Sequence, residues 1–160
     1  MADSLLEPGE RAFLQALDEL DVPYLIVGAG AAVLQGAPLV TQDIDLWFAD
    51  RTDRRLHQAA QRAGGVFVPG HFGMMPTQVG GGAIGDRIDV VTTPQGLQSF
   101  EEEYARSLQM DLDGIKVRVL PLERIIASKR AAGRPKDLAV IPALEAALAV
   151  QRDPGAQADD

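Results

Sequence analysis

Thr41-Gln42-Asp43-Ile44-Asp45-Leu46-Trp47-Phe48 is the stretch on which the expected fold and chemistry of this chain depend. The apolar residues from position 44 to 48 predict a short strand. On a strand, residues two apart point to the same face, so Asp43 and Asp45 project together while the apolar residues between them enter the core. Two neighbouring carboxylates repel each other unless a cation lies between them. The pattern therefore indicates a candidate metal site, although the same motif also occurs at solvated strand ends.

A third acid, in Arg87-Ile88-Asp89-Val90-Val91, lies in a second strand that is expected from Ile88 to Val91. Strand interiors disfavour aspartate, so Asp89 calls for an explanation. If the two strands are neighbours in the sheet, Asp43, Asp45 and Asp89 converge into an all-oxygen site suited to Mg²⁺. Such sites commonly hold two ions about 3.5–4 Å apart, which stabilise the attacking and leaving oxygens of a phosphoryl displacement. All three carboxylates are therefore candidate metal ligands and catalytic residues.

Length and composition limit the classes of protein that this chain can represent. Its 160 residues predict one domain over residues 1–150, followed by a disordered tail over 151–160. The chain has no cysteine and only two histidines, which excludes disulfides and histidine- or cysteine-rich metal centres. There is no apolar run of about 20 residues and no signal-peptide pattern, so we expect a cytoplasmic protein without membrane partners.

Charge is unevenly distributed along the chain. The net charge of −8 argues against broad binding to duplex nucleic acid. Residues 115–136, however, contain seven basic residues and one acid, so this segment carries +6 and the rest carries −14. The segment is either a solvated helix face or a local site for an anion smaller than a duplex, and the sequence leaves both interpretations open.

A glycine turn precedes the paired carboxylates. The apolar run 24–27 predicts a strand, Gly28-Ala29-Gly30 ends it, and a short helix is expected from Ala31 to Gly36. A dinucleotide fingerprint is excluded, because its sixth position is Val33 and the following acids come too early. A strand, a glycine turn and a short helix can still cradle a phosphate with backbone N–H groups.

The remaining pattern predicts a mixed sheet with helices packed on it. Further helices are expected over 7–20, 53–63, 97–106, 122–132 and 135–150, the last bent or interrupted near Pro142, and further strands over 66–68, 108–112 and 115–120. Pro69 to Gly85 is rich in glycine and is expected to form a loop or a loose hairpin.

The order of these motifs resembles the DNA polymerase beta-type nucleotidyltransferase superfamily, especially its minimal bacterial members, including toxin-type relatives. The resemblance rests on the turn at Gly28-Ala29, the Asp-x-Asp at 43–45, the later Asp89 and a basic helical end over 122–137. It implies an α+β fold, in which helices flank a nucleotidyltransferase-like mixed β-sheet and a helical pair ends the domain. Two positions depart from the family pattern: Ala29 stands where a serine is frequent, and Leu39 where a basic residue is frequent.

The resemblance also implies roles for the candidate residues. Asp43 and Asp45 would hold Mg²⁺ against the triphosphate of an NTP such as ATP, and Asp89 would bind a second ion and accept the proton of the attacking hydroxyl. The nucleotide-binding residues would be Gly28, Ala29 and Gly30, which line the phosphates, and Lys129, which adds a positive charge.

The function implied is transfer of an NMP from an NTP to an acceptor that the sequence does not identify: a small molecule, a protein or an RNA end. The segment from Gly70 to Gly85 is where we expect the acceptor to dock. Two alternatives stay open. One is a catalytically degenerate domain that binds a nucleotide or a partner protein, and the other is a toxin with an antitoxin partner that acts on RNA.

Overall fold

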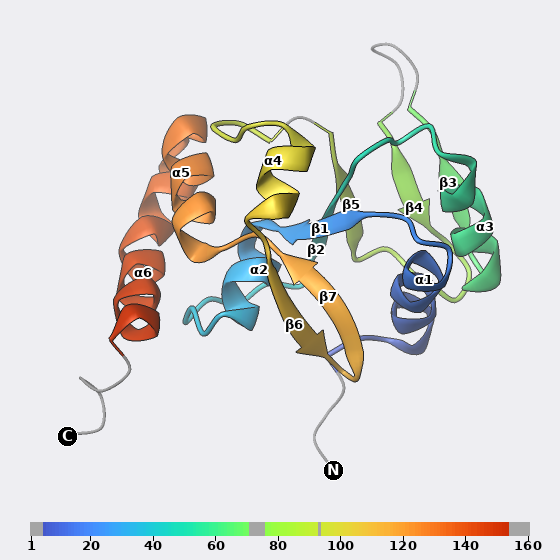
Figure 1. Ribbon diagram of the computed structural model, residues 1–160, viewed down its shortest axis with the longest axis horizontal. Coiled ribbons are helices and arrows are strands. Elements are labelled where there is room, and N and C mark those ends of the chain that lie inside the picture. Colours follow the sequence, from blue (N-terminus) through green and yellow to red (C-terminus); the bar gives the residue numbers. More distant parts are fainter. Residues whose placement is uncertain (1–4, 71–75, 93, 154–160) are drawn as a thin grey trace.

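The computed structural model of this protein describes residues 5–70, 76–92 and 94–153. It has a seven-stranded mixed sheet with helices on both faces (Figure 1). The helices are α1 (Pro8–Glu19), α2 (Gly28–Leu34), α3 (Arg54–Arg62), α4 (Phe100–Ala105), α5 (Leu122–Ala132) and α6 (Pro135–Arg152). The strands are β1 (Tyr24–Val27), β2 (Ile44–Phe48), β3 (Val66–Val68), β4 (Gln78–Gly80), β5 (Ile88–Val91), β6 (Leu108–Leu112) and β7 (Ile115–Val119).

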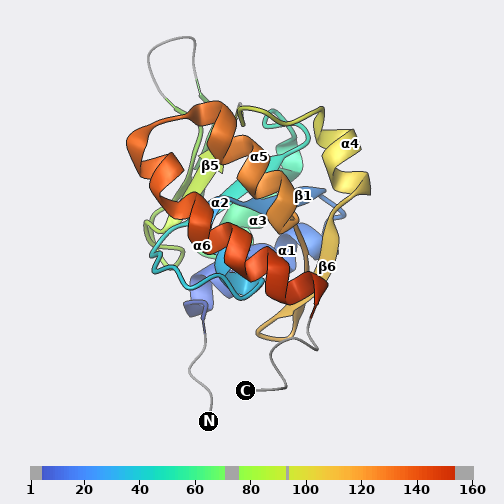
Figure 2. The same ribbon diagram turned by 90° about the vertical axis from the view of Figure 1, so that its left-hand side faces the viewer.

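The strand order β3-β4-β5-β2-β1-β7-β6 places the two aspartate-bearing strands side by side. β2 runs parallel to β5, and β1 runs parallel to β7, while the other pairs are antiparallel. The predicted α+β class is confirmed, as is the C-terminal helical pair, in which α6 packs along α5 (Figure 2). No helix of the described residues is long and apolar enough to cross a membrane.

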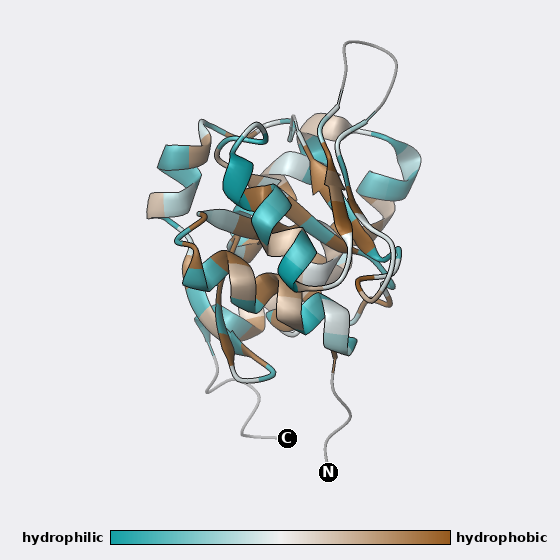
Figure 3. Cartoon of the chain, turned by 90° about the vertical axis from the view of Figure 1, so that its right-hand side faces the viewer, coloured by the Kyte–Doolittle hydropathy of each residue, from teal (hydrophilic) through white to brown (hydrophobic). Residues whose placement is uncertain are grey.

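The alternation of β2 separates the core from the face that carries the acids. Phe48 points towards α3, where its ring meets Phe67 of β3 edge-on at 6.4 Å between centroids. Trp47 points to the opposite face and contacts Phe100 of α4 edge-on at 5.2 Å. The hydropathy of the residues agrees with this arrangement. The strands that lie behind α1 and α3 are apolar, and the outer sides of the helices are hydrophilic (Figure 3). Asp45 lies on the same face of the sheet as Trp47, in a part of that face that α4 and α5 do not cover.

Helix α2 begins three residues earlier than predicted, directly at Gly28. Gly28 has φ of +67°, which glycine adopts without steric cost. The chain therefore turns from β1 into α2 without an intervening loop, and the alanines that follow favour the helix. As a result Gly28 lies at the C-terminal end of β1, close to Asp45 of the neighbouring strand β2.

Helix α6 is continuous through Pro142 to Arg152, so the interruption that was one of the two expectations at Pro142 is absent, and the helix extends two residues into the expected tail. A helical proline leaves the carbonyl four residues earlier without its partner. Here that residue is Leu138, which is 49% exposed, and Pro142 is itself exposed. Water can therefore satisfy the carbonyl, and the buried positions Ile141 and Leu144 keep the helix packed.

The glycine-rich segment contains a strand that the sequence did not indicate. β4 pairs antiparallel with β3 and with β5, where Gln78 lies opposite Asp89. Glycines lower β-propensity, but Val79 is buried in the core and its pairing with Phe67 holds the strand. β3 and β4 form a hairpin, which was one of the two expectations for this segment, although the sequence did not locate its second strand. Residues 71–75 of the predicted acceptor segment lie outside the described part of the chain.

Candidate active site

Asp45 and Asp89 lie opposite each other on neighbouring parallel strands. Partners in register point to the same face, so the two carboxylates project side by side. Asp43 lies just before β2, and the N–H of Ile44 donates to the carbonyl of Arg87 at 2.7 Å, which fixes the start of this pairing. The strand pairing that the metal-site hypothesis required is therefore present.

The electrostatics of Asp45 and Asp89 show repulsion between carboxylates, which the positive charge of Lys129 offsets only in part. Burial, then the charges of Asp89 and Asp43, raise the pKa of Asp45 from 3.8 to about 6, while the charge of Lys129 opposes the rise. The pKa of Asp89 is also raised, by burial and by Asp43. Neighbouring carboxylates thus disfavour the ionisation of Asp45 and Asp89, and a cation beside them would relieve the repulsion.

The geometry fits a metal that arrives with its substrate better than a closed metal cage. No three Asp, Glu or His side chains within the described ranges already surround a common point closely enough to hold an ion. Mg²⁺ usually keeps several waters and is bound by one or two carboxylates together with substrate phosphates. Asp45 and Asp89, with Asp43 at the end of the strand, suit that mode of binding.

The glycine turn lies close to the Asp45 carboxylate. A Cβ at position 28 would collide with Oδ2 of Asp45, whereas a Cβ at position 30 would lie 3.4 Å from the carbonyl oxygen of Asp43. A side chain at position 28 would therefore force the Asp45 carboxylate to move. Gly28 thus lies against Asp45 and Gly30 lies near the backbone of Asp43, while phosphate binding by Gly28, Ala29 and Gly30 stays a prediction.

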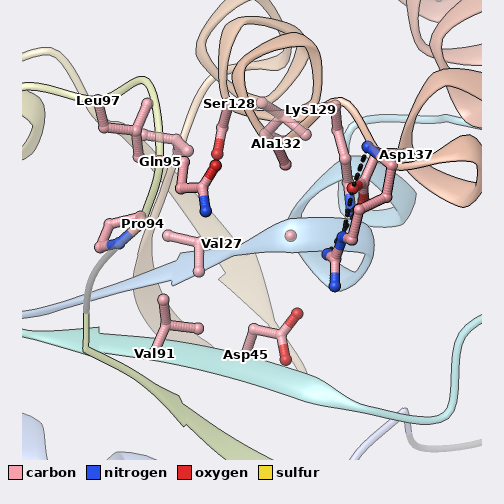
Figure 4. Close-up of a pocket in the computed structure, with 14 residues that line it drawn as sticks. Val27, Asp45, Val91, Pro94, Gln95, Leu97, Ser128, Lys129, Ala132 and Asp137 are labelled. Atoms are coloured by element: carbon pink, nitrogen blue, oxygen red, sulfur yellow. Dashed lines mark hydrogen bonds and ion pairs between the residues drawn. The ribbon is translucent and has the colours of Figure 1, made fainter.

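A cavity of about 430 Å³ opens from Asp45 towards α5 and the segment that follows β5 (Figure 4). One part of its wall is apolar and consists of Val27, Val91, Pro94, Leu97, Leu120, Ile125 and Ala132. The other part is polar and consists of Gly28, Asp45, Gln95, Ser128, Lys129, Arg134 and Asp137. The cavity thus combines a surface for a flat apolar group with a charged surface, as a nucleoside triphosphate needs.

A second cavity of about 340 Å³ meets the first at Asp45, Lys129 and Arg134. It also reaches Asp43 and Ala29, so it runs along the glycine turn and the start of β2. Because Asp45, Lys129 and Arg134 line both cavities, a candidate metal ligand and two positive side chains lie at their junction.

Asp137 is a buried carboxylate at the start of α6 that bonds to both of these cations. Its side chain is 1% exposed; it accepts a hydrogen bond from Arg134 Nε at 2.6 Å and forms an ion pair with Lys129 Nζ at 3.4 Å. Those bonds, Arg134 first, lower the pKa of Asp137 to about 2. Asp137 is therefore anionic at neutral pH and is held inside the protein by two positive charges.

The basic segment divides into structural and site-lining residues. Arg124 forms an ion pair with buried Glu103 at 2.8 Å, Arg130 pairs with Glu145 on α6, and the guanidinium of Arg118 lies 5.6 Å from the ring centroid of Tyr104. The residues that line the cavities are Lys129, Arg134 and Lys136. The segment thus combines cations that are paired within the protein with cations at the cavities, and for the latter the anion site stays a prediction.

A third hollow, of about 330 Å³, lies on the open face of β3, β4 and β5. Asp89 is at its edge, and its floor includes Val68, Gln78 and Val66, which is 58% exposed. Asp89 thus lies between this hollow and the site at Asp45. An acceptor bound here would be adjacent to the carboxylates.

Sequence reasoning missed the residues that shape the apolar end of the first cavity. Pro94, Gln95 and Leu97 come from the segment between β5 and α4, and Ser128 comes from α5 (Figure 4). This segment is held in place by Glu103, which accepts a hydrogen bond from the N–H of Gln98 at 3.1 Å. No motif marks these residues, because their role depends on how α4 and α5 pack.

Comparison with known proteins establishes the fold. No protein-family model matches the chain, and no curated protein matches it significantly in sequence. Two solved structures with TM-scores of 0.58 and 0.59 are ANT(2")-Ia in complex with adenylyl-2"-tobramycin and the lincosamide antibiotic adenylyltransferase LnuA bound to lincomycin. The first is 19% identical over 89% of this chain and 88% of its own, and the second is 16% identical over 89% and 98%.

A third similar structure is an antigenic nucleotidyltransferase-like protein from Paracoccidioides brasiliensis, with a TM-score of 0.52 and 21% identity over 95% of this chain and 91% of its own. All of these likenesses extend over nearly the whole of both chains. The protein therefore has the nucleotidyltransferase fold, which confirms the fold that the sequence resemblance implied.

The raised pKa of Asp45 predicts how stability depends on pH. Because the folded-state pKa of about 6 exceeds the unfolded value near 3.8, the folded state binds more protons between these values. The free energy of unfolding contributed by this group therefore falls as pH rises from about 4 to 6. Thermal denaturation in EDTA should show a steeper fall for the wild type than for Asp45→Asn.

Mg²⁺ should counteract the fall, because it favours the ionised carboxylates. Comparing the wild type with the variant removes the contribution of all other titrating groups. Identical pH profiles for the two proteins in EDTA would show that Asp45 does not experience the repulsion described above.

Proposed function

We propose that this protein is a Mg²⁺-dependent nucleotidyltransferase that moves an NMP from an NTP to a hydroxyl group of a small molecule. The observation that carries the proposal is the junction of the two cavities, where Asp45 contacts Gly28 and faces the cations Lys129 and Arg134. Acids, a close-approach backbone turn and positive charges within one site are what positioning and neutralising a triphosphate require.

Asp43, Asp45 and Asp89 would hold Mg²⁺, as one ion or two, and the metal would supply charge neutralisation at the phosphates when bound. The residues of the chain then have separate tasks. The apolar wall of the first cavity would hold the base and ribose, and Gln95 and Ser128 would contact their polar groups. Neither of these two side chains has a hydrogen-bond partner among the described residues, so both are free to bind a ligand.

In the transfer, the acceptor hydroxyl oxygen forms a bond to the α-phosphorus, and the bond from that phosphorus to the oxygen bridging the α- and β-phosphates breaks. Pyrophosphate leaves with the electron pair. The hydroxyl proton would pass to Asp89, which is exposed beside the third hollow and whose raised pKa makes it a better base than an ordinary aspartate. Lys129 and Arg134 would stabilise the negative charge on the departing phosphates.

The third hollow suggests the size and kind of acceptor. Its volume of about 330 Å³ is that of a small-molecule site rather than of a groove for a polymer. The structures of ANT(2")-Ia and LnuA contain an adenylylated tobramycin and a lincomycin, respectively. A hydroxyl-bearing small molecule is therefore the acceptor class that we favour over a protein or an RNA end.

Catalytic degeneracy is the competing interpretation, since Ala29 lacks a hydroxyl and Leu39 lacks a charge. Both residues line the second cavity, where Lys129, Arg134 and Lys136 also lie. The cations therefore supply at this position the charge that Leu39 does not. For this reason we favour turnover over binding alone.

The proposal is tested by incubating the protein with Mg²⁺, each α-labelled NTP and a panel of hydroxylated small molecules, with an RNA pool and a protein extract as separate arms. Transfer of label to a small molecule is the expected result. Transfer only to RNA or protein would replace the acceptor class. Mg²⁺-dependent NTP binding without any transfer would favour the degenerate domain.

A further inference from the structure

Asp137 has a place in the fold that helix packing alone does not explain. It is the third residue of α6, and it bonds back to the Arg134 backbone N–H at 3.3 Å, which caps the helix. A cap needs only a hydrogen-bond acceptor, and exposed polar residues commonly serve. Here the capping carboxylate is 1% exposed and also bonds to the side chains of Arg134 and Lys129.

The two cations that bond to Asp137 are also cations that line both cavities. Lys129 and Arg134 lie at the junction next to Asp45, and the charge of Lys129 acts on that carboxylate. Figure 4 shows Lys129 and Asp137 on the side of the cavity opposite Pro94 and Leu97, with dashed ion pairs between Asp137 and its partners. Long side chains lose rotamer freedom when they bind a ligand, and a fixed partner reduces that cost.

From these contacts we infer that Asp137 is a positioning residue, which holds Lys129 and Arg134 towards the triphosphate at the junction of the two cavities. The inference rests on the proposed function. The contacts that support it come from one carboxylate that connects two helices. Lys129 is in the last turn of α5, Arg134 precedes α6, and Asp137 bonds to both across the turn at Gly133. Asp137 itself would not touch the nucleotide's reacting atoms.

Loss of Asp137 should affect the binding of ATP and of AMP differently, because these nucleotides differ in their phosphates. The cations can act on the β- and γ-phosphates only if these are present, so Asp137→Asn should weaken Mg²⁺-ATP binding by about tenfold and leave AMP binding within about twofold. A merely structural role would distort the cavity and weaken both ligands alike. Isothermal titration of the two ligands separates these possibilities, and thermal denaturation reports the loss of the cap independently.

A double-mutant cycle tests whether Asp137 acts through the cations. In a Lys129→Met/Arg134→Gln background, adding Asp137→Asn should change ATP affinity by less than about twofold, because the groups that it positions are gone. The matched control is Glu145→Gln, which removes another ion pair between α5 and α6, with Arg130, that lines neither cavity. This control should bind both ligands as the wild type does.

Equal loss of ATP and AMP affinity in Asp137→Asn, or a full loss in the cation-free background, would overturn the inference while leaving the proposed function standing. A wild type that binds no Mg²⁺-NTP at all would overturn both. If Asp137→Asn does not fold, Asp137→Glu takes its place, because it keeps the buried charge and displaces it by one methylene. For the variant that is used, a loss of affinity that is confined to ATP and that disappears in the Lys129→Met/Arg134→Gln background supports the inference. Any other result contradicts it.

Discussion

Asp45→Asn should lower the rate of nucleotidyl transfer by about 10³-fold, since a metal-held phosphoryl group depends on several kcal/mol of charge stabilisation. Asp45 is the acid at the centre of the site: it pairs with Asp89 in the sheet, contacts Gly28 and lines both cavities. The loss should appear in kcat as well as in Mg²⁺-dependent NTP binding. Steady-state kinetics with the acceptor found by the label assay provide the measurement.

Stability separates this effect from simple unfolding. Asparagine removes the repulsion that raises the pKa of Asp45, so the variant should be at least as stable as the wild type at pH 7 in EDTA. Asp50→Asn is a suitable control, because Asp50 is exposed just past the other end of β2 and its Oδ1 accepts a hydrogen bond from the N–H of Thr52. Full activity in Asp45→Asn, or equal losses in both variants, would contradict the assignment of the acid pair.

Gly28→Ala should lower transfer by about 10²-fold, because displacing a catalytic group by around 1 Å can cost that much. The added methyl group would collide with Oδ2 of Asp45, and φ of +67° is unfavourable for alanine by about 1–2 kcal/mol. The carboxylate, the turn or both must therefore shift. Kinetics at saturating Mg²⁺ and a thermal unfolding curve measure the two consequences.

Two other glycines distinguish the collision from backbone strain. At Gly36, φ is +94° and a methyl group would meet nothing, so Gly36→Ala should lose stability but not activity. At Gly30, φ is not in the left-handed region and a methyl group would make only an ordinary contact of 3.4 Å, so Gly30→Ala should resemble the wild type in both. If Gly28→Ala and Gly36→Ala transferred the nucleotide at the same rate, the close approach of Gly28 to Asp45 would have no effect on catalysis.

The sequence predicted the structure well where the pattern of side chains directly reflects the backbone geometry of a strand. Alternation around Asp43 and Asp45 predicted both a strand and the face of the acids, and the structure has β2 over the predicted residues. Whether Asp89 joins them depended on strand order, which no local pattern encodes and which the family resemblance supplied. The parallel register of β2 and β5 now provides the geometric basis.

Features that depend on packing could not be predicted. β4 is rich in glycine and exists because β3 and β5 lie on either side of it. Gln95 and Ser128 reach the cavity only after α4 and α5 have packed on the sheet. Pro142 illustrates the opposite case, since a local rule predicted a bend or an interruption, and the interruption is absent because Pro142 lies on the exposed side of α6.

The central claim is metal-dependent cleavage between the α- and β-phosphates, and one measurement tests it most directly. Wild type and Asp45→Asn are incubated with Mg²⁺, the acceptor pool and an NTP labelled at either the α- or the γ-phosphate. The account predicts that the wild type alone transfers the α-label to an acceptor and releases the γ-label as pyrophosphate, and that EDTA abolishes both. Release of the γ-label as inorganic phosphate, transfer of the γ-label, or equal products from Asp45→Asn would contradict it.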